Sequence, residues 1–287
     1  MIINDRRLVI LSMDIEDWYH LDYFNSSDCN KNYSLLDGID IYLQILEKHN
    51  VPSSFFVLGE IAKSLSSGLN TIINNKNDIG SHGWDHRRPI MMSNAEFNDS
   101  LIKSKQTIEN IISTSVEGYR ASCFSLDRER LEQVQKAGYF YDSSRIDFGV
   151  HPLYETINMD GYELVVPNIF KNNDFFEFQV TTNLVYGKNI PISGGGYLRL
   201  LPWYISQRLI KPYLNQGELY ILYIHPFELS LKPNPPFPSA TKWYNKLRFG
   251  LGRPTVAEKL SRLINLLKNN GYRFTTFSSL RKELLDQ

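Results

Sequence analysis

The stretch LVILSM at residues 8–13, followed by the acidic run DIED at 14–17, indicates the fold class. A short, nearly continuous apolar run is typical of a strand that is buried on both faces, as the strands of parallel sheets are. The acidic run stands directly after it, where parallel α/β folds place their active sites. We therefore expect a central parallel strand with functional carboxylates at its carboxyl end.

Strand-like and helix-like segments alternate along the rest of the chain. Ser93 with Glu96, and Thr255 with Glu258, are expected to form capping boxes at the start of two helices. The order predicts one α/β domain with a parallel sheet, either a barrel or an open doubly wound sheet. The expected strands are 51–58, 78–81, 116–119, 139–141, 219–224 and 272–277, and the expected helices are 35–49, 60–75, 94–112, 127–137 and 256–268.

Two stretches interrupt this alternation. Residues 142–189 combine short polar and aromatic pieces, and residues 232–253 hold four of the 13 prolines in a segment expected to be a loop.

Composition and charge exclude several classes of protein. Of 287 residues, 42% are hydrophobic and 13% aromatic, which excludes disordered and fibrous chains. Lys+Arg and Asp+Glu both count 31, so no basic surface for nucleic acid is indicated. Two cysteines cannot build a disulfide framework, and the apolar stretch at 8–13 is too short for a secretion signal or a membrane span. These features predict a soluble, cytoplasmic protein.

The acidic run and a histidine pair are candidates for a metal site. Asp14, Glu16 and Asp17 can supply a hard oxygen ligand and, separately, a general base, or they can be a solvated loop. In SHGWDH, His82 and His86 are four residues apart, a spacing that on a helical turn lets both imidazoles hold one divalent ion. Two histidines with one carboxylate leave open positions on Zn²⁺ for water and substrate. A purely structural pair is the alternative.

Three further residues stand near strand ends. Arg120 in GYRASCF can pair with an acid from the first strand and hold it ionised, or it can make a surface salt bridge. His225 in LYILYIHP is either a proton donor at the site or a hydrogen-bonded core histidine. Asp142 in YFYDSS can accept from that imidazole, or it can begin a turn.

The ordered set MD-I-ED, SHGWDH, GYRAS, YDSS and LYIHP resembles the motifs of the NodB-homology polysaccharide deacetylases, carbohydrate esterase family four. The resemblance spans about residues 8–228 and implies a distorted (β/α)7 barrel. It implies one domain over 1–287, with a loop-rich insertion around 143–200 and a helix–strand completion at 254–287. The acidic run, GGGYLRLLP at 194–202 and HPFEL at 225–229 are most similar to the branch associated with exopolysaccharide export and exosortase.

This resemblance implies a role for each residue of the metal site. Asp14 matches the catalytic base and Glu16 the acidic metal ligand. Asp17 remains an alternative ligand, because some family members have adjacent acids. His82 and His86 match the two metal-binding histidines.

The remaining motif residues match groups that surround the reaction. Arg120 matches the arginine that orients the base, His225 the catalytic histidine, and Asp142 the acid that supports it. The backbone amide of Cys123 matches the oxyanion donor, while its thiol is expected only to fill space. Two departures concern Ser122, which replaces a proline, and residues 143–145, which lack the usual second acid and tryptophan. The second departure bears on the tuning of the histidine.

The function implied is a metal-dependent deacetylase that hydrolyses N-acetyl groups of amino sugars in a bacterial polysaccharide or its precursor. The implied cofactor is a divalent ion, Zn²⁺ first, with Co²⁺, Ni²⁺ or Mn²⁺ as alternatives. The implied partners are an amino-sugar glycan and the polysaccharide assembly machinery, without nucleic acid. Two alternatives are a hydrolase of another carbon–nitrogen bond, such as a formamide or small cyclic amide, and a non-catalytic carbohydrate-binding or assembly protein.

Overall fold

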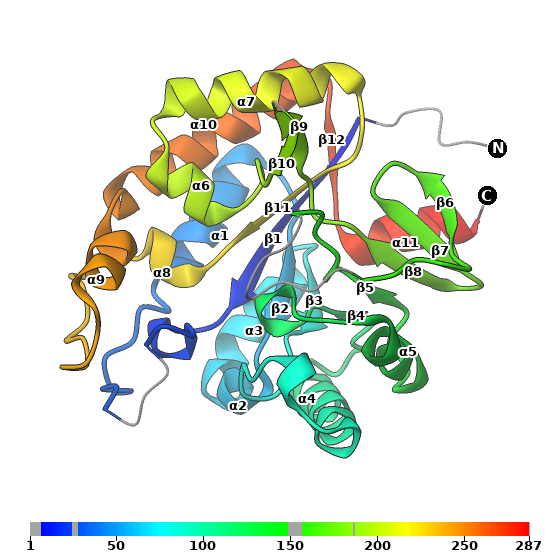
Figure 1. The fold of residues 1–287 in the computed structure, drawn as a ribbon, viewed down its shortest axis with the longest axis horizontal. Helices are drawn as coiled ribbons and strands as arrows, with labels where there is room; N and C mark the ends of the chain where they lie inside the picture. Colours follow the sequence, from blue (N-terminus) through cyan, green and yellow to red (C-terminus); the bar gives the residue numbers. More distant parts are fainter. Residues whose placement is uncertain (1–6, 25–27, 149–156, 186, 287) are drawn as a thin grey trace.

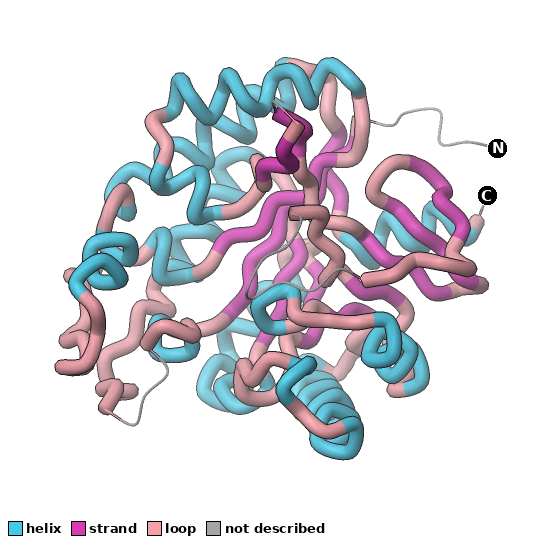
Figure 2. Tube along the Cα trace, viewed as in Figure 1, coloured by secondary structure: helices cyan, strands magenta, loops and turns pink. Residues whose placement is uncertain are grey.

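Seven parallel strands form the centre of the molecule in the computed structural model, which describes residues 7–24, 28–148, 157–185 and 187–286. Figures 1 and 2 show this sheet curled, with helices along its outer side. The expected α/β barrel is confirmed as a curled sheet, and in the described part of the chain no ladder joins its two outermost parallel strands. In spatial order the strands are β11 (Tyr220–Ile224), β1 (Leu8–Ile15), β2 (Ser54–Val57), β3 (Asp78–Ser81), β4 (Gly118–Tyr119), β5 (Tyr141–Asp142) and β8 (Phe175–Phe178).

Strand β1 is central because every one of its side chains is buried. Alternate residues of a strand point to opposite faces, and β1 divides accordingly. Val9, Leu11 and Met13 pack in the cluster that lies against the outer helices. Leu8 and Ile10 pack in the second cluster, to which helix α11 (Phe277–Leu285) contributes. The concave side is thus apolar at the amino end of β1, and Ser12, Asp14 and Glu16 continue it at the carboxyl end.

The insertion expected to be loop-rich around 143–200 contains five strands in its described part, which corrects that expectation. Strand β8 belongs to the main sheet, and β7 (Ile169–Asn172) and β6 (Glu163–Val166) extend it with antiparallel pairing. Strands β9 (Asn183–Val185) and β10 (Lys188–Ile190) form a separate hairpin. Because the apolar run of β8 is interrupted by the buried Glu177, its burial on both faces was not evident from the sequence.

The helices agree with the expected order but differ at several boundaries. Helix α1 begins at Gly38 rather than Leu35, at a close approach where any Cβ would clash with the carbonyl oxygen of Pro226. The helix expected at 60–75 is divided into three short pieces. The helices of the described chain are α1 (Gly38–His49), α2 (Gly59–Ala62), α3 (Ser66–Asn74), α4 (Asn94–Ile112), α5 (Arg128–Lys136), α6 (Gly195–Leu200), α7 (Trp203–Gln216), α8 (Pro226–Leu229), α9 (Trp243–Gly250), α10 (Val256–Asn269) and α11, with 3-10 turns η1 (Trp18–His20), η2 (Lys63–Leu65), η3 (Pro89–Met91), η4 (Ser122–Phe124) and η5 (Arg253–Thr255).

One of the two expected capping boxes is confirmed. The Ser93 side chain accepts from the amide of Glu96, whose carboxylate accepts in return from the Ser93 amide. The box at Thr255 is wrong, because Thr255 already has helical backbone angles and its hydroxyl donates to the Gly252 carbonyl at 2.8 Å.

The C-terminal part of the chain contains five helices that the sequence analysis did not expect. Helices α6 and α7 precede β11 and helix α8 follows it, and α9 and α11 come nearer the end. Helix α9 lies within the stretch 232–253 expected to be a loop. The closing strand is only β12 (Arg273–Thr275), which pairs with the amino half of β1, and α11 follows it. Phe277, Leu280 and Leu284 of α11 pack in the concave apolar cluster, so this helix closes the amino end of the curled sheet.

Candidate active site

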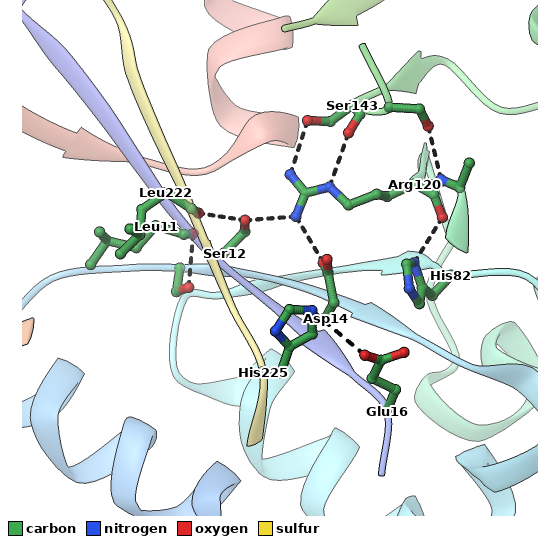
Figure 3. A network of polar contacts seen from close by, with 12 residues as sticks. Leu11, Ser12, Asp14, Glu16, His82, Arg120, Ser143, Leu222 and His225 are labelled. Carbon is green, nitrogen blue, oxygen red and sulfur yellow. Dashed lines mark hydrogen bonds and ion pairs between the residues drawn. The ribbon is translucent and has the colours of Figure 1, made fainter. Parts of the chain in front are cut away.

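The candidate residues gather on the concave side, at the carboxyl ends of four strands within one run of the sheet, β11-β1-β2-β3-β4. Asp14 lies near the end of β1, and His82, Arg120 and His225 directly follow β3, β4 and β11. Parallel strands bring these ends to one edge of the sheet, so residues far apart in the chain become neighbours. Figure 3 shows Asp14 between the guanidinium of Arg120 and the imidazole of His225.

Arg120 is completely buried and holds Asp14 in one orientation. Its Nη1 donates to Oδ1 of Asp14 and to the hydroxyl of Ser12, both at 2.8 Å. Its Nε and Nη2 donate to the carbonyl and hydroxyl of Ser143 at 3.0 and 2.9 Å (Figure 3). The guanidinium also lies over the ring of Phe56, 4.2 Å from its centroid. The guanidinium is therefore hydrogen-bonded through all three of its nitrogens, which offsets the cost of burying its charge.

Glu16, His82 and His86 form a group with the geometry of a metal site. One ligand atom from each lies within 4.8 Å of the other two, and all three side chains are buried. His86 Nε2 contacts Glu16 Oε2. His82 Nδ1 donates to the Arg120 carbonyl at 2.9 Å. In the neutral imidazole, Nε2 therefore carries no proton, and its lone pair is available to bind a metal ion. Two imidazole nitrogens and one carboxylate oxygen are a donor set that suits Zn²⁺ or a similar divalent ion.

The charges of Glu16 and His82 suit a cation. Despite burial, Glu16 raises the pKa of His86 above its ordinary value, so a bound ion would displace a proton from that imidazole. Burial lowers the pKa of His82 to about 4, despite the nearby carboxylates of Asp14 and Glu16, so its imidazole is neutral near pH 7. Burial by itself raises the pKa of Glu16, but His86, His225 and His82 outweigh it and lower that pKa below its ordinary value. The residues present therefore fit a divalent metal ion.

Asp17 serves the loop after β1 rather than this group. Its Oδ1 accepts from the amides of Trp18 at 2.8 Å and Leu35 at 2.9 Å, and it caps η1. A carboxylate committed to two backbone amides is held away from an ion. Of the two acids left open by the sequence, the structure groups Glu16 with the histidines.

His225 has Glu228 as its supporting acid in place of the expected Asp142. Its Nδ1 lies 3.2 Å from Oε2 of Glu228, and its Nε2 lies 3.5 Å from Oε1 of Glu16. Burial lowers the pKa of His225, but the hydrogen bond to Glu228 and the charges of Glu16, Glu228 and Asp14 raise it to about 9. The imidazole is therefore a cation near pH 7, able to give a proton from Nε2.

Asp142 instead positions the loop that follows β4. Its two oxygens accept from the amide and hydroxyl of Ser144, at 2.7 and 2.9 Å, and that hydroxyl accepts from the Ala121 amide at 2.8 Å. Its neighbour in register on β8 is Glu177, which is also fully buried. Burial raises the pKa of Asp142 to about 6.

Glu228 is itself held by residues of the GGGYLRLLP stretch. Nε of Arg199 donates to Oε1 of Glu228 at 3.3 Å, and both side chains are buried. Any Cβ at Gly195 would clash with the Glu228 carboxylate, so the glycine makes room for it. The sequence analysis missed Glu228, Arg199, Ser12 and Ser143. The HPFEL stretch contains Glu228 and the GGGYLRLLP stretch contains Arg199. The sequence analysis used both stretches only to indicate a branch of the family.

The loop of Cys123 lies beside the metal-site group. Cys123 and Phe124 have positive φ angles of 54° and 53°, which turn the backbone tightly. The Cys123 sulfur lies within 4.8 Å of ligand atoms of Asp22 and His86. Burial raises the pKa of its thiol, so the thiol stays protonated. The hydroxyl of Ser122, which replaces the usual proline, donates to the His82 carbonyl at 3.3 Å and ties the loop to β3.

Comparison with known proteins finds similarity to polysaccharide deacetylases in part of the chain. A family model described as polysaccharide deacetylase matches residues 37–141, and one described as a domain of unknown function matches residues 151–282. The peptidoglycan deacetylase of Helicobacter pylori is 27% identical over 117 residues, which are 41% of this chain and 40% of that protein. The chain thus matches less than half the length of this relative.

Solved structures of low sequence identity share the fold. A Mycobacterium smegmatis structure described as a polysaccharide deacetylase aligns with a TM-score of 0.66 and 17% identity, over 99% of this chain and 91% of that one. A family-four pseudoenzyme from Bacillus anthracis aligns with a TM-score of 0.54 and 14% identity, over 96% of this chain and 66% of that one. Because a pseudoenzyme shares the fold, the argument for catalysis depends on the side chains described above.

Proposed function

We propose that the protein is a metal-dependent deacetylase that hydrolyses the N-acetyl group of an amino sugar in a bacterial polysaccharide or its precursor. One observation carries the proposal: the group of Glu16, His82 and His86 lies beside the buried Asp14–Arg120 pair and the cationic His225. Ligands, base and acid are thus present around one point, as hydrolysis of an amide requires.

Glu16, His82 and His86 would hold the divalent ion, which supplies a Lewis acid that polarises the acetyl carbonyl and lowers the pKa of water. Asp14 takes the proton of the attacking water at Oδ2, because Oδ1 is held by Arg120. The water oxygen bonds to the acetyl carbon, and the Cys123 amide donates to the developing oxyanion.

Breakage of the carbon–nitrogen bond requires a proton on the sugar nitrogen. His225 supplies this proton from Nε2, while Glu228 holds Nδ1 and stabilises the imidazolium. Acetate and the free amino sugar are the products. Arg120, Asp142 and Glu228 act as positioning residues in this scheme.

Exopolysaccharide is the substrate class that we favour within this function. Support comes from the resemblance of the GGGYLRLLP and HPFEL stretches to the branch associated with exopolysaccharide export. Their residues Gly195, Arg199 and Glu228 contact one another beside His225. The matched relative acts on peptidoglycan according to its name, so peptidoglycan is the substrate to compare. We further propose that residues 1–287 form one domain, because β8 and β11 of the second matched segment pair with β5 and β1. We also propose that the protein associates with polysaccharide assembly machinery.

We also propose a cytoplasmic location, which the scarcity of cysteine supports, because a chain with two cysteines cannot build a disulfide framework. Cell fractionation with an antibody to the chain tests it, and recovery outside the cytoplasmic fraction would overturn it. In the described residues, no helix has both the length and the apolar character needed to cross a bilayer.

Acetate release tests the function directly. The protein is stripped with a chelator, reloaded with Zn²⁺, Co²⁺, Ni²⁺ or Mn²⁺, and given acetylated glucosamine oligomers, isolated peptidoglycan and acetylated exopolysaccharide. We expect acetate from at least one glycan, only after reloading. Release from formamides or cyclic amides alone indicates a different carbon–nitrogen hydrolase. Glycan binding without release, in fully loaded protein, indicates a non-catalytic protein.

A further inference from the structure

The segment between α8 and α10 carries an exposed apolar surface that neither the fold nor the proposed chemistry explains. Trp243 and Leu247 of α9 are 74% and 57% exposed, and Leu251 directly after the helix is 52% exposed. Leu231, shortly after α8, is 77% exposed. Several large apolar side chains exposed on one part of a protein surface mark an interaction site. We call these four residues, together with Tyr244, the α9 surface.

The α9 surface has a helical arrangement with two different sides. At about 100° per residue, Trp243, Tyr244 and Leu247 share one side of α9, and Phe249 falls on the opposite side. Phe249 is fully buried and stacks on Phe227 with ring centroids 4.8 Å apart. One side of the helix therefore fixes it to the protein, and the other is left to bind something else. Figure 1 places α9 at the edge of the molecule, next to α8.

The segment that carries the α9 surface is positively charged, although the carboxylate of Asp37 lies 3.8 Å from Nζ of Lys232 at its margin. Residues 231–253 contain five basic residues and no acidic residue, although the whole chain has equal numbers of both. Lys242 and Arg248 are exposed, Lys246 is half-buried, and Lys232 stands next to Leu231. Exposed Trp, Tyr and Leu side chains flanked by Lys and Arg are the composition of a helix that lies in a membrane interface with anionic lipids.

We propose that the α9 surface docks the protein on a bilayer that contains anionic phospholipid. The positive charge of residues 231–253 argues against a second copy of this chain, because a symmetric contact would place cation against cation. The three exposed leucines argue against a glycan, which stacks on aromatic faces and gains little from aliphatic chains. The membrane is thus the occupant that explains both the apolar and the charged groups.

Docking would place the active site near the bilayer, because one arginine connects the two regions. Nη1 of Arg199 donates to the carbonyls of Phe249 and Leu251, at 3.1 and 2.8 Å, and contacts that of Arg248. Nε of the same guanidinium donates to Glu228, which holds His225. The substrate implied is a glycan close to the membrane surface, such as a lipid-linked chain; this last step depends on the proposed deacetylase function, whereas docking does not.

Vesicle co-sedimentation of the full chain tests the docking. We expect binding to vesicles of phosphatidylglycerol with phosphatidylcholine, weak binding to phosphatidylcholine alone, and loss of binding as salt is raised. Trp243→Ala and Leu247→Ala should each weaken binding about tenfold. Leu164→Ala is the matched control, because Leu164 on β6 is also 57% exposed and should not matter. Lys242→Gln should weaken binding about fivefold, and Lys136→Gln on α5 should not.

Other outcomes would overturn the docking. Absence of binding to anionic vesicles, or equal losses in Leu164→Ala and Leu247→Ala, would do so. A dimer in sedimentation that Trp243→Ala dissociates would also overturn it, because the α9 surface would then bind a second copy. Quenching of Trp243 fluorescence by soluble amino-sugar oligomers, at concentrations where vesicles do not bind, would overturn it in favour of a glycan. Both α9 variants should keep full activity on soluble oligomers. Vesicle binding by a protein that releases no acetate would reject the deacetylase function and leave the docking in place.

Discussion

The Nδ1 atom of His225 lies 3.2 Å from Oε2 of Glu228, three residues further along the chain. Glu228 lies on α8, and its carboxylate is also bound by Arg199. The imidazole of His225 therefore has a buried acid at Nδ1 and Glu16 of the metal-site group near Nε2. The His225 imidazole is thus supported from the C-terminal half of the chain rather than from β5.

Glu228→Gln should lower the pKa of His225. The charge of Glu228 helps to hold that pKa at about 9, so its removal lets the imidazole lose its proton at lower pH. Activity that needs the imidazolium disappears as pH rises through its pKa, so the alkaline limb of the kcat/KM profile should move to lower pH by about one unit or more. The measurement is the pH–rate profile of the metal-loaded enzyme.

Glu132→Gln, on the exposed side of α5, is the control and should leave the profile unchanged. If Glu228→Gln lowers the rate equally at all pH values, Glu228 has only a structural role.

Asp14→Asn should abolish turnover and keep the metal. The amide can still accept from Arg120, but it cannot take a proton from water, so we expect a loss of about a hundredfold to ten-thousandfold in kcat. Metal content by elemental analysis should stay stoichiometric. Loss of the metal in this variant would make Asp14 a ligand rather than the base.

His82→Ala should release the metal. This change removes one of the two imidazoles and also the hydrogen bond to the Arg120 carbonyl. The metal-to-protein ratio after dialysis should fall well below that of His49→Ala, a histidine variant at the end of α1 outside the site. Full activity of metal-depleted His82→Ala would reject the mechanism.

Gly195→Ala should reproduce the effect of Glu228→Gln. The added methyl group would occupy the position of the Glu228 carboxylate, which must then move away from His225. We expect the alkaline limb of the kcat/KM profile to move to lower pH, and the free energy of unfolding to fall by about 1–3 kcal/mol. Gly196→Ala is a close control, because a Cβ there meets no atom within 4 Å. Similar behaviour of the two variants would show that Gly195 matters only for backbone freedom.

The part of the site that the sequence predicted is the part that follows strands directly. Asp14, His82, Arg120 and His225 each stand near the end of a short apolar run, and parallel pairing is sufficient to bring such positions together. Glu228 was missed because its role depends on the turn of α8, which folds the side chain back onto the ring three residues earlier. Such a contact leaves no periodic trace in a sequence.

The elements that the sequence did not predict have signals that depend on tertiary packing. Helix α9 lies in a proline-rich stretch and has only Phe249 fully buried, so its pattern is not that of a core helix. Helix α11 fills the concave end of the sheet with Phe277, Leu280 and Leu284, a need that only a curled sheet creates. Strand β8 contains a buried acid, Glu177, which hides the strand from a search for apolar runs.

The buried acids Asp142 and Glu177 should make stability depend on pH. They are neighbours in register on β5 and β8, and neither is exposed. Burial raises the pKa of Asp142 to about 6, and burial with the charge of Asp142 raises the pKa of Glu177 well above its ordinary value. The folded chain therefore retains protons that the unfolded chain has lost by about pH 5.

Glu177→Gln tests this relationship. Because the folded state binds more protons than the unfolded state, the free energy of unfolding decreases as pH rises from about 4 through the raised pKa values. Glutamine is neutral at every pH, so the variant should gain about 1–3 kcal/mol relative to the unmodified protein between pH 5 and pH 9 in urea unfolding. For the control variant Glu163→Gln, on the exposed part of β6, the free energy of unfolding should vary with pH as it does in the unmodified protein. Equal pH dependence in all three proteins would mean that the two acids share no proton in the folded state.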